Sequence, residues 1–202
     1  MKGCVRGLEP QLLHDHAAAI TREYLDSRAK NPGYTFQWPK RDGLSVYEVV
    51  RAALAVMTDG RCAYCDGHPT VTGTEEVDHF RPKTRSEFYD LVCAWDNLFL
   101  VCTGCNRAKR NHWDEALLRP DADDFDFSRY FSYRTDTGNL EPNPTAQPED
   151  RLRAQRTIDL LDLNRSGACI GRRHSVKIIL SSPPEVLDDV SYRYLIPLCK
   201  AA

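Results

Sequence analysis

The chain has 202 residues, of which 42% are hydrophobic and 28% charged, and its formal net charge is −2. This composition is typical of a folded globular protein and excludes a disordered or fibrous chain. Domains that bind nucleic acid by bulk charge usually have a pI above about 9, so any nucleic-acid contact here must be local. The length predicts one compact unit. The polar first ten residues, and the lack of an apolar run of about 18 residues, predict no secretion signal, no membrane role and a cytoplasmic location.

The first predicted element is a helix over residues 11–30, in which apolar residues recur at three- and four-residue steps. Asn31-Pro32-Gly33 should end it. A second helix is predicted after Asp42-Gly43, with Ser45 as N-cap and Glu48 as its capping-box partner. Its expected buried face consists of Val46, Val49, Val50, Ala53, Leu54 and Met57. These two helices form a predicted N-terminal flank, residues 1–60.

The central block, residues 61–118, has short apolar runs separated by loops that contain Gly and Pro. Phe99–Val101 is the clearest strand, and the block as a whole favours a hairpin followed by a helix.

Residues 119–202 form a predicted C-terminal extension. Its first part, 119–150, carries eight acidic and three basic residues and favours a hairpin with a turn at 136–139. From 151 to 177 the balance reverses to seven basic and two acidic residues, and a helix is predicted that ends near Asn164. We expect this helix to pack on the central block. The segment after Lys177 receives no functional assignment.

Two C-x2-C pairs stand out in the central block. They are Cys62-Ala63-Tyr64-Cys65 and Cys102-Thr103-Gly104-Cys105, with 36 residues between them. In a reducing compartment such pairs act as metal ligands rather than disulfides, and four thiolates suit a structural Zn²⁺ ion with no open position. The other four cysteines, which have no such spacing, are expected to be small buried hydrophobic residues: Cys4, Cys93, Cys169 and Cys199.

The residues between the two cysteine pairs resemble the motif of HNH endonucleases. They include Val77-Asp78-His79-Phe80-Arg81-Pro82-Lys83 and Trp95-Asp96-Asn97-Leu98, and Asn106 and Lys109 follow the second pair. The resemblance implies an α+β fold with a zinc-stapled ββα-metal core flanked by N- and C-terminal helices. It also implies the catalytic residues His79, Asn97, Asp78 and Asn106.

The chemistry of these residue types agrees with such an enzyme. An imidazole with a near-neutral pKa can take a proton from the attacking water, so His79 is the predicted general base. Asp78 and Asn106 offer oxygen ligands to a catalytic divalent ion. Many HNH enzymes carry a second histidine where this chain has Asn106, and an amide oxygen favours Mg²⁺ or Mn²⁺ over softer metals. Asn97 is expected to orient the histidine through amide hydrogen bonds.

Three basic residues follow the second cysteine pair and are predicted to contact phosphate: Arg107, Lys109 and Arg110. Each could instead lie on a solvated helix face. Lys109 is the preferred candidate, because the HNH motif has a lysine there.

Looser motifs beyond the core are similar to the HNH subunit of Septu-type and retron-associated anti-phage systems. These are Leu117-Leu118-Arg119-Pro120, the acidic stretch 121–126 and the run 157–164. The resemblance implies a co-encoded ATPase partner that restrains the nuclease, with DNA as the favoured substrate and RNA as an alternative. A different interpretation, a zinc-stapled binding module that cuts no bond, stays open at this point.

Overall fold

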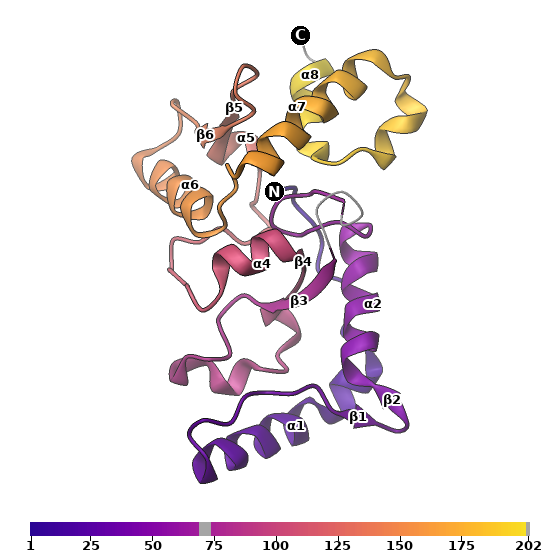
Figure 1. Ribbon diagram of the computed structural model, residues 1–202, viewed down its shortest axis with the longest axis vertical. Coiled ribbons are helices and arrows are strands. Elements are labelled where there is room, and N and C mark those ends of the chain that lie inside the picture. Colours follow the sequence, from indigo (N-terminus) through magenta and orange to yellow (C-terminus); the bar gives the residue numbers. More distant parts are fainter. Residues whose placement is uncertain (69–73, 201–202) are drawn as a thin grey trace.

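Strands β3 and β4 form an antiparallel hairpin at the centre of the protein (Figure 1). In the computed structural model, which describes residues 1–68 and 74–200, β3 covers Glu75–His79 and β4 covers Leu98–Cys102. Their register pairs Glu75 with Cys102 and His79 with Leu98. Helix α4, Thr103–Lys109, follows β4 directly and contacts both strands. The predicted hairpin followed by a helix is therefore confirmed, as a ββα unit.

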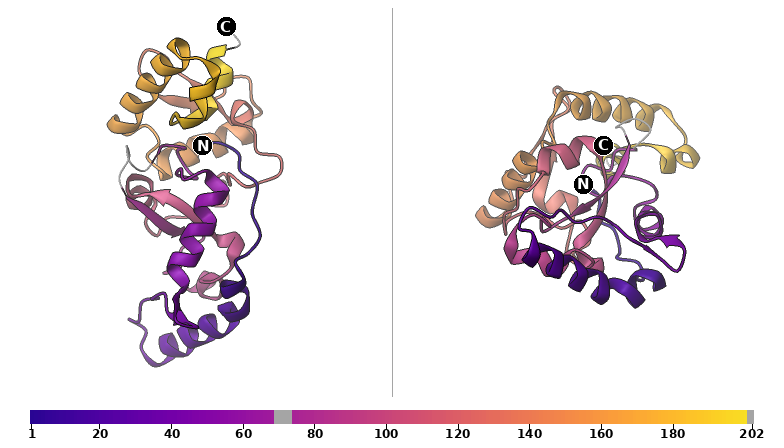
Figure 2. Two further views of the ribbon diagram at one scale, coloured as in Figure 1. Left: turned by 90° about the vertical axis from the view of Figure 1, so that its right-hand side faces the viewer. Right: turned by 60° about the horizontal axis from the view of Figure 1, so that its bottom comes forward.

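The other elements lie on two sides of this unit, which gives the molecule an elongated outline (Figures 1 and 2). On the N-terminal side are α1 (Gln11–Lys30), β1 (Lys40–Arg41), β2 (Leu44–Ser45) and α2 (Val46–Thr58). The loop between β3 and β4 holds the 3-10 helices η1 (Ser86–Leu91) and η2 (Trp95–Asn97). On the C-terminal side are α5 (Phe127–Tyr130), β5 (Phe131–Tyr133), β6 (Leu140–Pro142), α6 (Pro148–Leu160), α7 (Ser166–Ser181), η3 (Pro184–Asp189), η4 (Arg193–Leu195) and α8 (Ile196–Lys200).

Strand β4 is buried on both faces. Successive side chains of a strand point to opposite sides, so Leu98 and Leu100 face one way and Phe99 and Val101 the other. The two leucines pack in a hydrophobic cluster with α1 and α2, whereas Phe99 and Val101 belong to a second cluster that includes the C-terminal elements. A single strand thus connects the cores of the two ends of the molecule.

The N-terminal helices follow the predicted pattern with one difference. Helix α1 ends at Lys30, as the Asn-Pro-Gly sequence predicts. At α2, Ser45 caps the helix by accepting a hydrogen bond from the backbone N–H of Glu48. The carboxylate of Glu48 binds the guanidinium of Arg51, so the structure shows the forward half of the predicted capping box. Val46, Val50 and Leu54 form the fully buried part of the expected face.

The C-terminal extension contains the predicted hairpin, with β5 and β6 joined through the expected turn. Helix α6, however, ends at Leu160 rather than near Asn164, because Asp162 adopts a positive φ of 44° that turns the chain. Leu161 and Leu163 are buried beyond the helix end, whereas Leu152 is 55% exposed. The apolar spacing that predicted one long helix therefore belongs to a helix and the turn after it.

The end of the chain returns to the first cysteine pair. The carboxylate of Asp66, the residue after Cys65, accepts hydrogen bonds from the backbone and the guanidinium of Arg193. The Arg193 guanidinium also pairs with Asp59, at 2.6 Å. From the other side, Arg61 donates to the carbonyl oxygen of Val190. The segment after Lys177, which has no predicted function, thus packs against the start of the central block.

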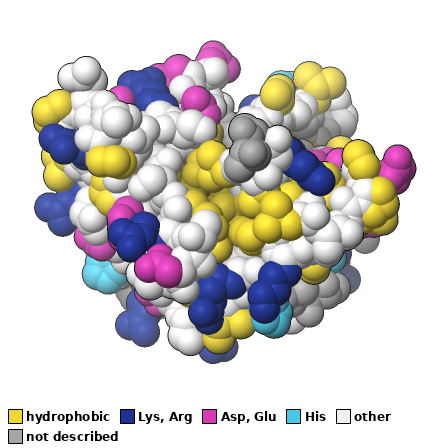
Figure 3. Space-filling model, turned by 90° about the horizontal axis from the view of Figure 1, so that it is seen from above, with side chains coloured by type: hydrophobic (Ala, Val, Ile, Leu, Met, Phe, Trp, Pro, Cys, Tyr) yellow, Lys and Arg dark blue, Asp and Glu magenta, His cyan; other side chains and the backbone are white. Residues whose placement is uncertain are grey.

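At the C-terminal end of the molecule, apolar side chains reach the surface (Figure 3). Ile178, Leu180 and Val186 are each more than 40% exposed there. No helix in the described part of the chain is long and apolar enough to span a membrane.

Candidate active site and metal centre

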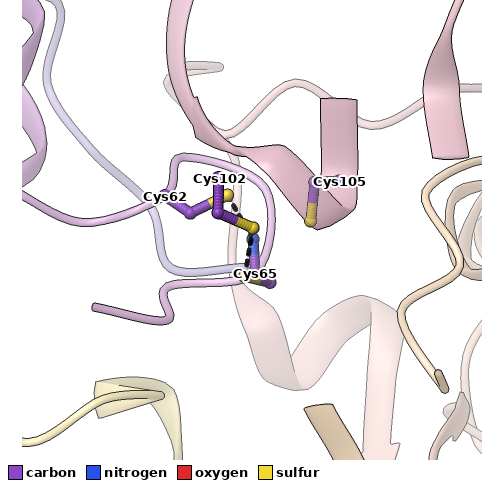
Figure 4. A group of neighbouring side chains, drawn as sticks. All are labelled: Cys62, Cys65, Cys102 and Cys105. Atoms are coloured by element: carbon purple, nitrogen blue, oxygen red, sulfur yellow. Dashed lines mark hydrogen bonds between the residues drawn. The ribbon is translucent and has the colours of Figure 1, made fainter. Parts of the chain in front are cut away.

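The four cysteines of the two C-x2-C pairs converge on one point (Figure 4). Cys62 and Cys65 lie in the turn after α2, Cys102 ends β4, and Cys105 lies in the first turn of α4. Their Sγ atoms all lie within 4.8 Å of one another, and all four residues are buried. The backbone N–H of Ala63 donates to the carbonyl oxygen of Leu100 in β4 at 2.8 Å, which holds the first cysteine pair beside the end of β4, where α4 begins.

This geometry fits a closed tetrahedral metal site. Four soft sulfur donors are the ligand set of structural zinc. Backbone N–H groups point at the sulfurs of the first pair, from Cys65 to Cys62 and from Gly67 to Cys65. None of the eight cysteines, each in the described part of the chain, forms a disulfide. Cys93 and Cys169 are buried as expected, whereas Cys4 and Cys199 are half-buried.

Asp78 lies near the end of β3 and is only 6% exposed. Burial raises the pKa of its carboxyl, and the Lys109 ammonium and the Tyr64 hydroxyl oppose this rise. The Tyr64 hydroxyl donates to Asp78 Oδ2 at 2.7 Å, and the Lys109 ammonium lies 3.0 Å from the same oxygen. Tyr64 lies between the cysteines of the first pair, so its side chain connects the metal centre to Asp78.

His79 follows at the end of the strand, with its ring held from three sides. Its Nε2 lies 2.9 Å from the carbonyl oxygen of Val92. Trp38 stacks on the imidazole at 6.0 Å between centroids, and Phe36 meets it edge-on at 5.9 Å. Burial, and next the cation of Lys83, lower the pKa of His79 to about 3. Because a carbonyl oxygen can only accept a hydrogen bond, Nε2 carries the proton and Nδ1 is the basic nitrogen.

Asn97, just before β4, holds the loop that joins the two strands. Its Oδ1 accepts from the backbone N–H of Arg81, and its Nδ2 donates to the carbonyl oxygens of Arg81 and Leu91. The expected amide bonds are thus present. Since Leu91 directly precedes Val92, this side chain supports the carbonyl that orients His79.

A pocket of about 150 Å³ brings Asp78, His79 and Asn106 together. Lys83 from the loop and Arg110 from the end of α4 also line it. The amide nitrogen of Asn106 donates to the carboxylate of Glu76, which leaves its carbonyl oxygen as the atom able to bind a cation. Asp78 and Asn106 therefore offer two hard oxygen donors beside His79, a set that fits a divalent ion.

The basic residues of α4 separate into three positions. The side chain of Lys109 has no exposed surface and binds Asp78 and the carbonyl oxygen of His79. The prediction that Lys109 contacts phosphate is wrong for this arrangement, because its ammonium is buried and already paired with the carboxylate of Asp78. Arg107 is exposed outside the pocket, and Arg110 is exposed at its edge.

Several residues of this centre were missed from the sequence. Glu76 could have been found, because it lies two residues before Asp78 and so on the same face of the strand. Lys83 lies inside the recognised motif but had no assigned role. Phe36 and Trp38 come from a distant segment with no local signal.

The C-terminal extension also reaches the metal centre, through Arg165. Its guanidinium lies 3.5 Å from the sulfurs of Cys102 and Cys105. Burial lowers the pKa of this guanidinium, but the nearby thiolates outweigh burial and raise it above its usual value.

Comparison with known proteins agrees with this geometry. Residues 62–112, which contain the ββα unit and both cysteine pairs, match the HNH endonuclease family. These residues are therefore similar to an HNH endonuclease domain. Over 173 residues it is 28% identical to the Septu protein PtuB of Bacillus mycoides (strain KBAB4), an alignment that covers 71% of this chain. The chain spans 56% of the length of that relative.

Proposed function

We propose that this protein is a metal-dependent endonuclease that hydrolyses nucleic-acid phosphodiester bonds. The observation that carries the proposal is the pocket in which Asp78, His79 and Asn106 meet within the HNH domain.

In this proposal the Nδ1 atom of His79 accepts the proton of the attacking water. The hydrogen bond from Nε2 to Val92 and the contacts with Phe36 and Trp38 keep Nδ1 in one orientation. A base held in position needs no reorganisation when the substrate arrives. Asn97 acts as a positioning residue, because it supports the loop that carries the Val92 carbonyl.

Asp78 and Asn106 would hold the catalytic divalent ion, Mg²⁺ or Mn²⁺. When bound, such an ion polarises the scissile phosphate and stabilises the leaving oxygen. Lys109 and Tyr64 fix the Asp78 carboxylate from below. Arg110, exposed at the edge of the pocket, is the proposed contact to the nucleic-acid backbone, and Arg107 extends it. The four cysteines hold structural zinc and take no part in the reaction.

The similarity to a Septu protein supports a role in anti-phage defence. In this role the nuclease acts in the cytoplasm with a co-encoded PtuA-like ATPase that restrains it, on DNA in preference to RNA. The net charge of −2 supports the need for a partner, because bulk electrostatic attraction to nucleic acid is weak.

The test is a cleavage assay on plasmid DNA, single-stranded DNA and tRNA, with Mg²⁺, Mn²⁺ or EDTA, with and without the ATPase. Wild type should cut in a divalent-dependent manner, and His79→Ala should lose cutting while it keeps its zinc. His112→Ala is the matched control, since His112 is exposed and outside the pocket. Cleavage that persists in His79→Ala, or that no metal or partner elicits, would instead support the zinc-stapled binding module.

A further inference from the structure

Arg165 is the residue of the C-terminal extension that reaches the cysteine cluster. It occupies the N-cap position of α7, sixty positions after Cys105 in the chain. One guanidinium nitrogen, Nη1, lies 3.5 Å from Cys105 Sγ. The other, Nη2, lies 3.5 Å from Cys102 Sγ and 3.8 Å from Cys65 Sγ. A single side chain thus contacts three of the four sulfurs.

The backbone around Arg165 holds the guanidinium in this place. Its Nη1 also donates to the carbonyl oxygen of Asp162, in the turn that ends α6. On the other side lies Gly104, inside the second cysteine pair. A Cβ atom added at Gly104 would lie 2.9 Å from Nε and 3.1 Å from the guanidinium carbon of Arg165. The absence of a side chain at residue 104 therefore makes room for the arginine.

The charge of the metal centre explains why a cation is favourable beside the sulfurs. Four thiolates around one Zn²⁺ ion carry a net charge of −2, and all four cysteines are buried. A buried charge is costly unless it is paired and hydrogen-bonded. The planar guanidinium presents five N–H donors in a fixed fork, so one arginine can reach several separate sulfurs at once, whereas the ammonium of a lysine is a more compact charge with three donors.

We propose that Arg165 helps the four cysteines to retain their metal ion. Its guanidinium offsets the negative charge of the thiolates and donates hydrogen bonds to them. Through this residue the C-terminal extension controls how firmly the HNH domain holds its structural ion. The inference rests on the proposed tetrathiolate zinc site and is independent of cleavage activity.

The test measures zinc release from the purified full-length protein to an excess of chelator, followed with a colorimetric zinc indicator. Outer-shell partners of metal ligands typically change metal affinity by about 10- to 100-fold. We therefore expect Arg165→Met to release zinc at least about tenfold faster than wild type, and Arg165→Lys to fall between them. Arg151→Met, which changes an exposed arginine of α6, is the matched control and should behave as wild type.

A second variant tests the same contact without changing the arginine. Gly104→Ala should push the guanidinium away from the sulfurs and speed zinc release as Arg165→Met does, even if Arg165→Met folds poorly. Wild-type release rates in Gly104→Ala and Arg165→Lys, at full zinc content, would overturn the proposal and leave the zinc site intact. A wild-type protein that purifies without a thiolate-bound metal would overturn both.

Discussion

Replacing Lys109 by Met tests whether this lysine is an internal counter-charge or a phosphate contact. The ammonium has no exposed surface and lies 3.0 Å from the Asp78 carboxylate, whose side chain is 7% exposed. It also donates to the carbonyl oxygen of His79 at 2.7 Å. Methionine keeps an unbranched side chain one heavy atom shorter than lysine but removes the charge and these bonds.

The expected cost is large because a buried carboxylate loses its partner. Breaking a buried ion pair by removing one member costs about 3–5 kcal/mol. Domains are stable by about 5–15 kcal/mol, so Lys109→Met should remove about a fifth or more of the free energy of unfolding. The double variant Lys109→Met, Asp78→Asn should cost clearly less than the sum of the two single variants, because it leaves no unpaired charge.

Urea unfolding of the zinc-loaded protein at neutral pH, followed by tryptophan fluorescence, measures these free energies. Nucleic-acid affinity at several salt concentrations, measured on the still-folded fraction, provides the second readout. A loss of stability below about 1 kcal/mol, together with a salt dependence reduced by one charge, would refute the counter-charge role. That result would return Lys109 to the surface role predicted from the sequence.

Four further perturbations separate the roles of other parts of the structure. Removing the metal with a strong chelator should unfold the ββα unit and lower the melting temperature in calorimetry, because structural zinc contributes about 10–16 kcal/mol in zinc-finger peptides; an unchanged melting temperature would contradict a structural ion. Asn97→Ala should cost about 3 kcal/mol in urea unfolding, since three backbone hydrogen bonds are lost at about 1 kcal/mol each; a cost within experimental error would show that the loop does not depend on it. Arg110→Ala should weaken nucleic-acid binding and lower the salt slope of the affinity by about one. Asp66→Asn should leave nucleic-acid binding unchanged and make the chain around Arg193 sensitive to protease. Unchanged binding in Arg110→Ala together with weakened binding in Asp66→Asn would reverse these assignments.

The metal centre and the order of elements around it could be predicted from the sequence because their signals are local. Two identical cysteine spacings indicate a set of four metal ligands even when the rest of the fold is unknown. The resemblance to the HNH motif implies that Asp78-His79 ends the first strand and that Asn97 precedes the second, and both residues lie at those places. The pocket that joins Asp78, His79 and Asn106 agrees with that prediction.

The surroundings of the site could not be predicted, because they depend on contacts between distant segments. Lys109 stands in a basic run with Arg107 and Arg110, and sequence alone does not show which of the three turns inward. The aromatic contacts of His79 come from Phe36 and Trp38, about forty residues earlier. Neither the inward turn of Lys109 nor the aromatic contacts of His79 are marked by a periodic pattern in the sequence.

The length of α6 was predicted incorrectly for a related reason. Leu161 and Leu163 continue the apolar character of the helix, but the chain turns at Asp162. Asp tolerates a positive φ better than most residues, and this preference is too weak to predict a helix end from one sequence. The turn matters, because it places Arg165 over the cysteines.

The two-faced burial of β4 has a consequence for how the domain is delimited. The segment that matches the HNH family, residues 62–112, contains β4 but none of α1, α2 or the C-terminal elements that cover its two sides. Excised as a fragment, it would expose Leu98 and Leu100 on one side and Phe99 and Val101 on the other. Each such side chain loses about 1.5–3 kcal/mol when it returns to water. The stretch of chain that matches the family is therefore smaller than the unit that folds cooperatively, and a stable minimal fragment has to retain both flanks.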